Sequence, residues 1–125
     1  KLEGLDYLNQ LSNGGIAPLH RASGYGLVEN IRWLLKFRAN VDIARGDNGR
    51  TPLLVAAEGG FMEACELLLS EGASVNARGT DGQSALHLAC DPVKLVGNTS
   101  RKSLEKLAQL LLAHRADPEM RDNEG

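Results

Sequence analysis

The sequence predicts an all-α repeat fold: a solenoid of helix–turn–helix units joined by β-turn or hairpin loops. Three observations predict it. A pattern of about 33 residues occurs three times in one phase. Each copy contains two short apolar segments separated by a glycine or another turn signal. Aromatic residues make up only 4% of the 125 residues. That is thin for an ordinary globular core, but it suits a solenoid, whose core is short aliphatic side chains between stacked helices.

The most regular copy runs from Gly49 to Ala77. After a glycine and a Thr-Pro-Leu turn, an apolar segment leads to a Gly-Gly break, and a second segment ends in the three leucines 67–69. Thr51 can cap the first helix through its hydroxyl. Gly72 has the position and chemistry of a left-handed C-cap for the second helix. This stretch resembles one ankyrin repeat, a helix–turn–helix and β-turn unit with a period of about 33 residues.

Two further copies align with it. Pro18-Leu19 lies one repeat period before Pro52-Leu53, and Gly82 lies one period after Gly49. The second half of the third copy aligns only with a longer shift, so we expect an insertion of about ten residues near 93–102. The resemblance therefore covers nearly the whole chain.

The resemblance implies ankyrin repeats at 15–47, 48–80 and 81–124. Residues 1–14 carry leucines at three-residue spacing, which predicts a helix that either caps the array or ends a preceding repeat. These leucines are Leu2, Leu5, Leu8 and Leu11. We expect the chain to be a fragment of a longer protein.

In the first copy the two helices are expected at about 18–24 and 27–37, with Leu19 and Ala22 facing inward. Trp33 occupies the place that leucine takes in the other copies, which favours packing over binding for this side chain. Arg38 aligns with Gly72, as does Arg115 in the third copy, so both arginines are expected at a helix end that favours positive φ.

In the third copy Ser84 replaces Thr51 as the cap of the first helix. The second helix is expected to begin at Thr99 or Ser100 and to be about one turn longer than its counterparts.

Motifs and composition argue against catalysis and against metal or cofactor binding by this chain. The three histidines stand apart, without the paired Cys or carboxylate spacing of a metal site. His20 and His87 occupy the place of a histidine that is structural in the ankyrin motif. No nucleophile elbow, phosphate-binding loop or zinc-protease motif is present. We therefore expect no enzyme activity, no metal and no cofactor.

Nucleic acid and membrane are not expected partners. The net charge is −2, and no basic face is interleaved with aromatic residues. No apolar run approaches the ~18 residues that a membrane-spanning helix needs. Cys65 and Cys90 are expected to be buried, reduced thiols, which suggests an intracellular protein in the cytoplasm or the nucleus.

The resemblance implies a non-catalytic module that binds a partner protein or peptide. In this family the β-turn tips and the inner helices form an extended concave face. Carried over to this sequence, the expected contact residues lie at those tips and directly after the paired small residues of each first helix. They are Tyr25, Arg45, Asp47, Asn48, Arg50, Glu58, Arg78, Thr80, Gln83, Asp91 and Arg121.

Three arginines of this set, Arg45, Arg78 and Arg121, recur at one place in successive repeats. Stacking would put them roughly 8–10 Å apart in a row. Such a row would receive an acidic or phosphorylated peptide, because guanidinium groups match carboxylates and phosphates bidentately. The alternative is that each arginine is a solvated turn residue paired with a nearby aspartate such as Asp47.

Two broader alternatives stay open. The chain could be the substrate-recognition or regulatory arm of a larger machine such as a ubiquitin-ligase receptor, a kinase or a channel. It could also be an architectural spacer that binds nothing. As a fragment it is expected to be a monomer.

Overall fold

The computed structural model describes residues 15–89 and 101–114, with side chains of the second range from residue 105 onward. Within these ranges the secondary structure is entirely helical. The predicted segment 1–14, the inserted residues 93–100, Cys90, Asp91, Arg115 and Arg121 lie outside the described residues. The helices are α2 (Pro18–Gly24), α3 (Val28–Lys36), α4 (Pro52–Gly59), α5 (Met62–Ser70), α6 (Ala85–Ala89) and α7 (Arg101–Ala113).

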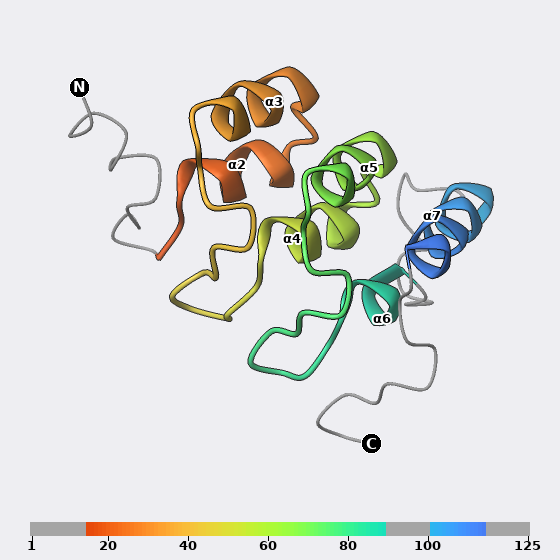
Figure 1. The fold of residues 1–125 in the computed structure, drawn as a ribbon. Helices are drawn as coiled ribbons and strands as arrows, with labels where there is room; N and C mark the ends of the chain where they lie inside the picture. The colour runs from red at the N-terminus through yellow and green to blue at the C-terminus, as the bar shows by residue number, and fades with distance from the viewer. Residues whose placement is uncertain (1–14, 90–100, 115–125) are drawn as a thin grey trace.

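The helices follow one another as antiparallel pairs that stack side by side. The first helices of the pairs, α2, α4 and α6, form one row, and α3, α5 and α7 form a second row (Figure 1). The loops 38–51 and 71–84 project from the array beyond the first row and lie side by side (Figure 1). The predicted all-α solenoid of helix–turn–helix units is confirmed.

The helices of the first row begin at residues whose side chains favour a helix start. Pro18 and Pro52 stand at the first helical position, where proline's missing N–H is not needed. Thr51 Oγ1 accepts a hydrogen bond from the Leu54 N–H at 3.4 Å, and Ser84 Oγ accepts one from the His87 N–H at 3.4 Å. Both predicted caps are confirmed.

The core lies between the two rows and is aliphatic. Leu68 on α5 is fully buried, as the alignment of the copies predicts for its position, and Leu107 and Leu111 bring α7 onto the same core. The inward positions of α2, Leu19 and Ala22, are also buried. At roughly 25 cal/mol per Å², burial of one leucine side chain contributes about 2 kcal/mol.

The helices α3 and α5 are both followed by a residue with positive φ. The chain leaves α5 through Gly72 at φ 92°, and it leaves α3 through Arg38 at φ 69°. Arg38 is the one residue other than glycine with positive φ among the described residues. The expected equivalence of the two positions is thus confirmed. The α7 helix has 13 residues against nine in α3 and α5, which is the additional turn that the sequence predicts.

The turns between the helices of a pair interlock from one repeat to the next. The ring of Phe61 lies against the backbone of Gly59 in its own repeat and of Gly26 in the preceding one. A Cβ atom at Gly26 would lie 2.6 Å from Cδ1 of that ring. A bulky aromatic ring therefore fills the space that two glycines leave open.

Trp33 does not pack inside the array, which corrects the expectation from sequence. Its side chain is 56% exposed and contacts the ring of Phe37, with the two centroids 4.7 Å apart. Its counterpart Leu67 is partly buried against the core. The difference arises because α5 lies between α3 and α7, whereas α3 has a described neighbour on one side only.

Candidate functional site

The loop tips are braced against each other by backbone hydrogen bonds. The Thr80 N–H donates to the Asn48 carbonyl at 2.8 Å, and the Gly46 N–H donates to the Gly15 carbonyl at 2.9 Å. The Ser74 N–H donates to Asp42 Oδ1 at 2.9 Å, which adds a contact between the two loops. The tips therefore form one connected edge of the array.

Arg45 is engaged within its own turn. Its Nε donates to one carboxylate oxygen of Asp47 at 2.9 Å, and a terminal nitrogen donates to the other at 2.6 Å. The hydrogen bonds from Arg45 hold the pKa of Asp47 below its ordinary value. This bidentate pair is the local pairing that the sequence offered as the alternative to an arginine row.

Arg78 differs from Arg45. It is exposed, and within the described residues its guanidinium makes no ion pair. The structure thus places a paired and an unpaired arginine at equivalent positions of two successive tips, and Arg121 lies outside the described residues.

Arg50, below the loop tips, connects α4 to the following loop through two ion pairs. It is only 9% exposed, and its terminal nitrogens lie 2.6 Å from Glu58 Oε1 and 3.0 Å from Asp81 Oδ2. Glu58 is in the last turn of α4 and Asp81 is in the following loop. The Gln83 N–H and the Arg50 guanidinium hold the pKa of Asp81 below its ordinary value. Arg50 is thus largely buried in its ion pairs, whereas the Glu58 side chain stays half exposed.

Asn48, Thr80 and Gln83 also hold the loops in shape. Asn48 Oδ1 accepts from the Arg50 N–H at 3.0 Å, and the Thr80 hydroxyl donates to the Asn48 carbonyl at 3.1 Å. The Gln83 N–H donates to Asp81 Oδ1 at 3.0 Å. Among these three expected contact residues, Thr80 is exposed and the other two are half-buried.

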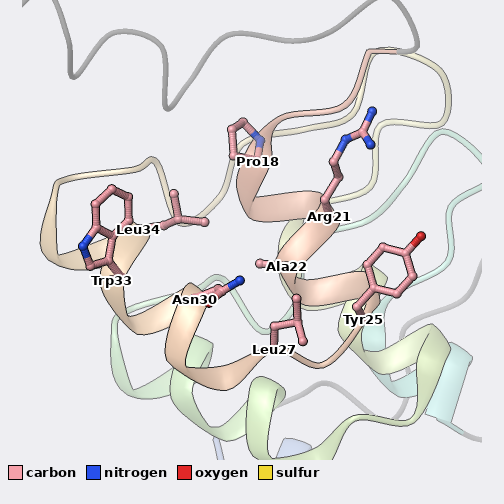
Figure 2. A pocket seen from close by; sticks show the side chains of 8 residues that line it. All are labelled: Pro18, Arg21, Ala22, Tyr25, Leu27, Asn30, Trp33 and Leu34. Carbon is pink, nitrogen blue, oxygen red and sulfur yellow. The ribbon is translucent and has the colours of Figure 1, made fainter.

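Tyr25 is the most exposed large apolar side chain in the described residues, at 74%. It lies directly after α2 and forms one wall of a groove with a volume of about 450 Å³ (Figure 2). The groove runs over the outer face of the α2–α3 pair. Its lining residues are Pro18, Arg21, Ala22, Tyr25, Leu27, Asn30, Trp33 and Leu34.

Sequence reasoning identified Tyr25 but missed the rest of this groove. A signal was present in the alignment of the copies. Arg21 stands where the second copy has Val55, and Asn30 stands where it has Ala64. Polar residues at positions that are buried elsewhere in an array mark a face with a different neighbour.

His20 is a structural residue. Its Nδ1 accepts a hydrogen bond from the Ala17 N–H at 2.9 Å, so Nε2 carries the proton and donates to the Ile43 carbonyl at 2.7 Å. Burial lowers the pKa of His20 below its ordinary value, and the bond to Ile43 opposes that shift. The ring satisfies the Ala17 N–H at the start of α2 and ties this helix to the following loop.

The described residues offer no site for catalysis by a metal or a thiol. They contain no group of three His, Cys, Asp or Glu side chains placed to hold a metal ion. Cys65 is buried, and burial raises the pKa of its thiol to about 12. Within the same residues no helix is long and apolar enough to cross a membrane.

Comparison with known proteins agrees with this geometry. The family model described as ankyrin repeats, in three copies, matches residues 19–122. The chain belongs to the ankyrin repeat family. Ankyrin repeats are in general modules that bind proteins and carry no catalytic function, which fits an array whose polar groups are used to brace its own loops.

Curated relatives are similar over part or all of this ankyrin array. The B-cell lymphoma 3 protein homolog of Mus musculus is 40% identical over 60% of the chain, and the human ankyrin repeat and SOCS box protein 18 is 40% identical over 64%. The E3 ubiquitin-protein ligase KEG of Arabidopsis thaliana is 30% identical over 98%. The chain spans only 17%, 17% and 7% of the lengths of these relatives.

Proposed function

We propose that this ankyrin array is a non-catalytic recognition module whose concave face, made of loop tips and first-row helices, binds a partner protein or peptide. The observation that supports this most is the bracing of the loops. Their tips are joined by hydrogen bonds of 2.8–2.9 Å between backbone groups while side chains such as Arg78 and Thr80 face solvent. A surface ordered before binding loses little conformational entropy when a partner arrives.

Tyr25 and Arg78 are the proposed centres of this surface. Tyrosine and arginine are enriched among the residues that carry binding energy. Tyr25 offers an exposed ring, and Arg78 offers a guanidinium that no described carboxylate engages. Arg45 is already bound to Asp47, so it can contact the partner only if its guanidinium binds Asp47 and the partner at the same time. Asp91 and Arg121 stay proposed members of the surface outside the described residues.

An acidic or phosphorylated segment is the proposed partner chemistry at Arg78. A guanidinium group forms two parallel hydrogen bonds to a carboxylate or a phosphate, and these charge-assisted bonds are stronger than neutral ones. Asp47 and Asp81 border the tips and reduce the local positive potential, so we propose a short acidic stretch rather than an extended polyanion.

The test compares two variants of the surface with a matched control. Tyr25→Ala and Arg78→Glu should each lose the partner that the wild-type chain retains, while their circular dichroism stays that of the wild type. Arg32→Glu changes the same charge on α3, where Arg32 pairs with the exposed Glu29, and should retain the partner. Equal loss in all three variants would place the binding surface elsewhere. A wild-type chain that retains no protein would favour the architectural spacer.

A second candidate is the substrate-recognition arm of a ubiquitin ligase. It is favoured by the relatives named as an ankyrin repeat and SOCS box protein and as an E3 ubiquitin-protein ligase. Purification of the full-length parent protein tests it, because ligase components should co-purify with the parent and not with this chain alone. We also propose an intracellular location, in the cytoplasm or the nucleus, which fits the buried thiol of Cys65.

A further inference from the structure

A second groove runs between α3 and α5, which lie side by side in the second helix row (Figure 1). Its part nearest the turns has a volume of about 370 Å³, and its middle part has a volume of about 500 Å³. Val28 of α3 and Glu63 of α5 line both parts, so the two parts form one continuous groove. We call it the α3–α5 groove. The central walls are completed by Arg32, Glu66 and Leu67.

The α3–α5 groove faces away from the core. The residues of α5 that line its middle part recur at helical spacing and are Glu63, Glu66, Leu67 and Ser70. Positions three and four residues apart share one face of a helix. Leu68 lies on another face of α5 and is fully buried in the core between the two rows. The groove is therefore on the opposite side of the array from the first row and the loop tips.

The floor of the α3–α5 groove is apolar. Phe61, Met62 and Leu67 pack against the core, and like Val28 they are only half-buried. Their remaining surface lines the groove. Methionine fits partners of different shape, because its side chain is unbranched and flexible. An apolar side chain that lies on this floor would remove apolar surface from water, which favours binding.

The rim of the α3–α5 groove is acidic. Glu63 and Glu66 are exposed, and neither makes an ion pair within the part of the chain that the structure describes. Arg32 lines the opposite wall but donates to Glu29 of its own helix at 3.1 Å. Arg32 is thus neutralised on α3, and the two glutamates of α5 keep their negative charge beside the apolar floor.

We propose that the α3–α5 groove receives a helix of a partner protein that carries lysine or arginine residues beside a short apolar stripe. The nine residues of α5 are roughly 13 Å long, about two and a half turns of a helix laid alongside. Apolar side chains of that helix cover Met62 and Leu67, as when an amphipathic helix enters a groove. Its cations pair with Glu63 and Glu66 and fix its orientation.

This surface is separate from the one proposed at the loop tips. The tips present Arg78 to an acidic segment, whereas the α3–α5 groove presents Glu63 and Glu66 to a basic helix. Because the two surfaces lie on opposite sides of the array, both partners can be bound at once. The array would then connect two proteins of opposite charge preference, and the groove can be tested without the partner of the tips.

The test uses a synthetic probe and the whole chain. The probe is a fluorescein-labelled amphipathic helix with a leucine stripe flanked by lysines, and fluorescence anisotropy measures its binding. Glu63→Gln and Glu66→Gln should each weaken binding about two- to fivefold, the range for one exposed ion pair. Glu71→Gln is the matched control, because Glu71 is exposed at the end of α5 and does not line the groove. It should bind the probe as the wild type does.

Arg32→Glu should strengthen binding of the probe by a similar factor, because it removes a cation from the groove wall and releases Glu29. A general effect of the glutamine variants on stability would not produce this gain. A scrambled probe of the same composition, without the leucine stripe, should bind more weakly. Equal binding of the two probes would show attraction by charge alone and would overturn the proposal.

The side-chain methyl resonance of Met62 gives the location of the probe. It should shift when the probe is added to the wild type, and Met62→Leu assigns the signal. Three other outcomes would overturn the proposal. They are a wild type that does not bind the probe, a loss in Glu71→Gln equal to the loss in the groove variants, and binding that leaves the Met62 methyl resonance unchanged.

Discussion

Arg38 occupies a backbone conformation that its side chain disfavours. At φ 69° it ends α3 in the same way that Gly72 ends α5. For an L-residue with a side chain the left-handed region costs roughly 1–2 kcal/mol relative to the right-handed one. Alignment of the copies was enough to predict this, because the conformation is set by a local helix end.

Replacing Arg38 by glycine should stabilise the protein. Relief of the strain is partly offset by the larger entropy of glycine in the unfolded chain, so the expected gain in unfolding free energy is several tenths of a kcal/mol up to about 1. Denaturant titration measures it, with Arg38→Lys as the control that retains both strain and charge. A clearly destabilised glycine variant would mean that the arginine side chain contributes more than the strain removes.

His20 makes the stability of the protein sensitive to mild acid. Its pKa is lower in the folded protein than in the unfolded chain because burial disfavours the imidazolium. The contribution of the neutral ring is therefore present above the unfolded value of about 6.5 and is lost as pH falls through the folded pKa. Protonation would also remove the acceptor at Nδ1 that holds the Ala17 N–H.

We expect the unfolding free energy to decrease between about pH 7.5 and pH 5.5, and His20→Gln to reduce that slope. The pKa values of Asp47 and Asp81 lie below their ordinary values, so these carboxylates stay ionised throughout this range. Denaturation curves at several pH values test the prediction. A His20→Gln protein with the slope of the wild type would show that another group is responsible.

The position of the Trp33 side chain was not predictable from its own residue type. Repeat alignment assigns it the place of a packed leucine, but packing there depends on whether a neighbour covers the face. That information lies in the rest of the array and not in the pattern around Trp33. The same alignment was reliable for Leu68, because α5 has neighbours on both sides.

Leu68→Ala tests the core of the second helix row. Leu68 is fully buried, and truncation of such a leucine costs about 2–5 kcal/mol. The expected result is a protein that is largely unfolded at room temperature. The control is Leu112→Ala at the half-exposed Leu112 of α7, which should change the unfolding free energy by less than about 1 kcal/mol. A loss below about 1 kcal/mol for Leu68→Ala would contradict its place in the alignment.

Gly26→Ala tests the turn-to-turn contact between the first two helix pairs. The new methyl group would meet the Phe61 ring at 2.6 Å in addition to the strain of φ 67°. Overpacking of this kind adds roughly 1–3 kcal/mol. The matched variant is Gly72→Ala, where φ is 92° but no atom lies within 4 Å of the added Cβ. Equal losses in the two variants, measured by denaturation, would show that the ring moves aside freely.

The helices, their caps and their order were predictable because each depends on residues close in sequence. The pairing of the candidate contact residues was not predictable in this way. Arg50 joins Glu58 and Asp81, which come from α4 and the next loop, and only the folded array brings them together. The sequence therefore names candidate contact residues but does not separate those that pair within the array from those that face solvent.

Salt should weaken partner binding if the proposed surface is right. An exposed charge mainly changes the association rate and its salt dependence. Arg45→Glu with Arg78→Glu should slow association at low salt without unfolding the domain, and the difference from wild type should shrink at high salt because charges are screened. Most of the effect should come from Arg78→Glu, since Arg45 is engaged by Asp47. Surface-binding kinetics at two salt concentrations measure this.

Equal association rates of wild type and double variant at low salt would remove the arginines from the binding surface. Tyr25 and the end of α4 near Glu58 would then be the better candidates. Arg32→Glu on α3, in the second row of helices, remains the control for a general effect of net charge.

The glycine pair around Phe61 bears on how an array of this kind can grow. Phe61 requires a glycine at position 26 of the preceding unit, and its own unit carries Gly60 at the equivalent place, with φ 74° against 67°. A tandem duplicate of the second repeat would therefore present to its own copy the same glycine that Phe61 now meets. The unit is compatible with itself, so gene duplication could lengthen this array at that point without any compensating substitution in the turn.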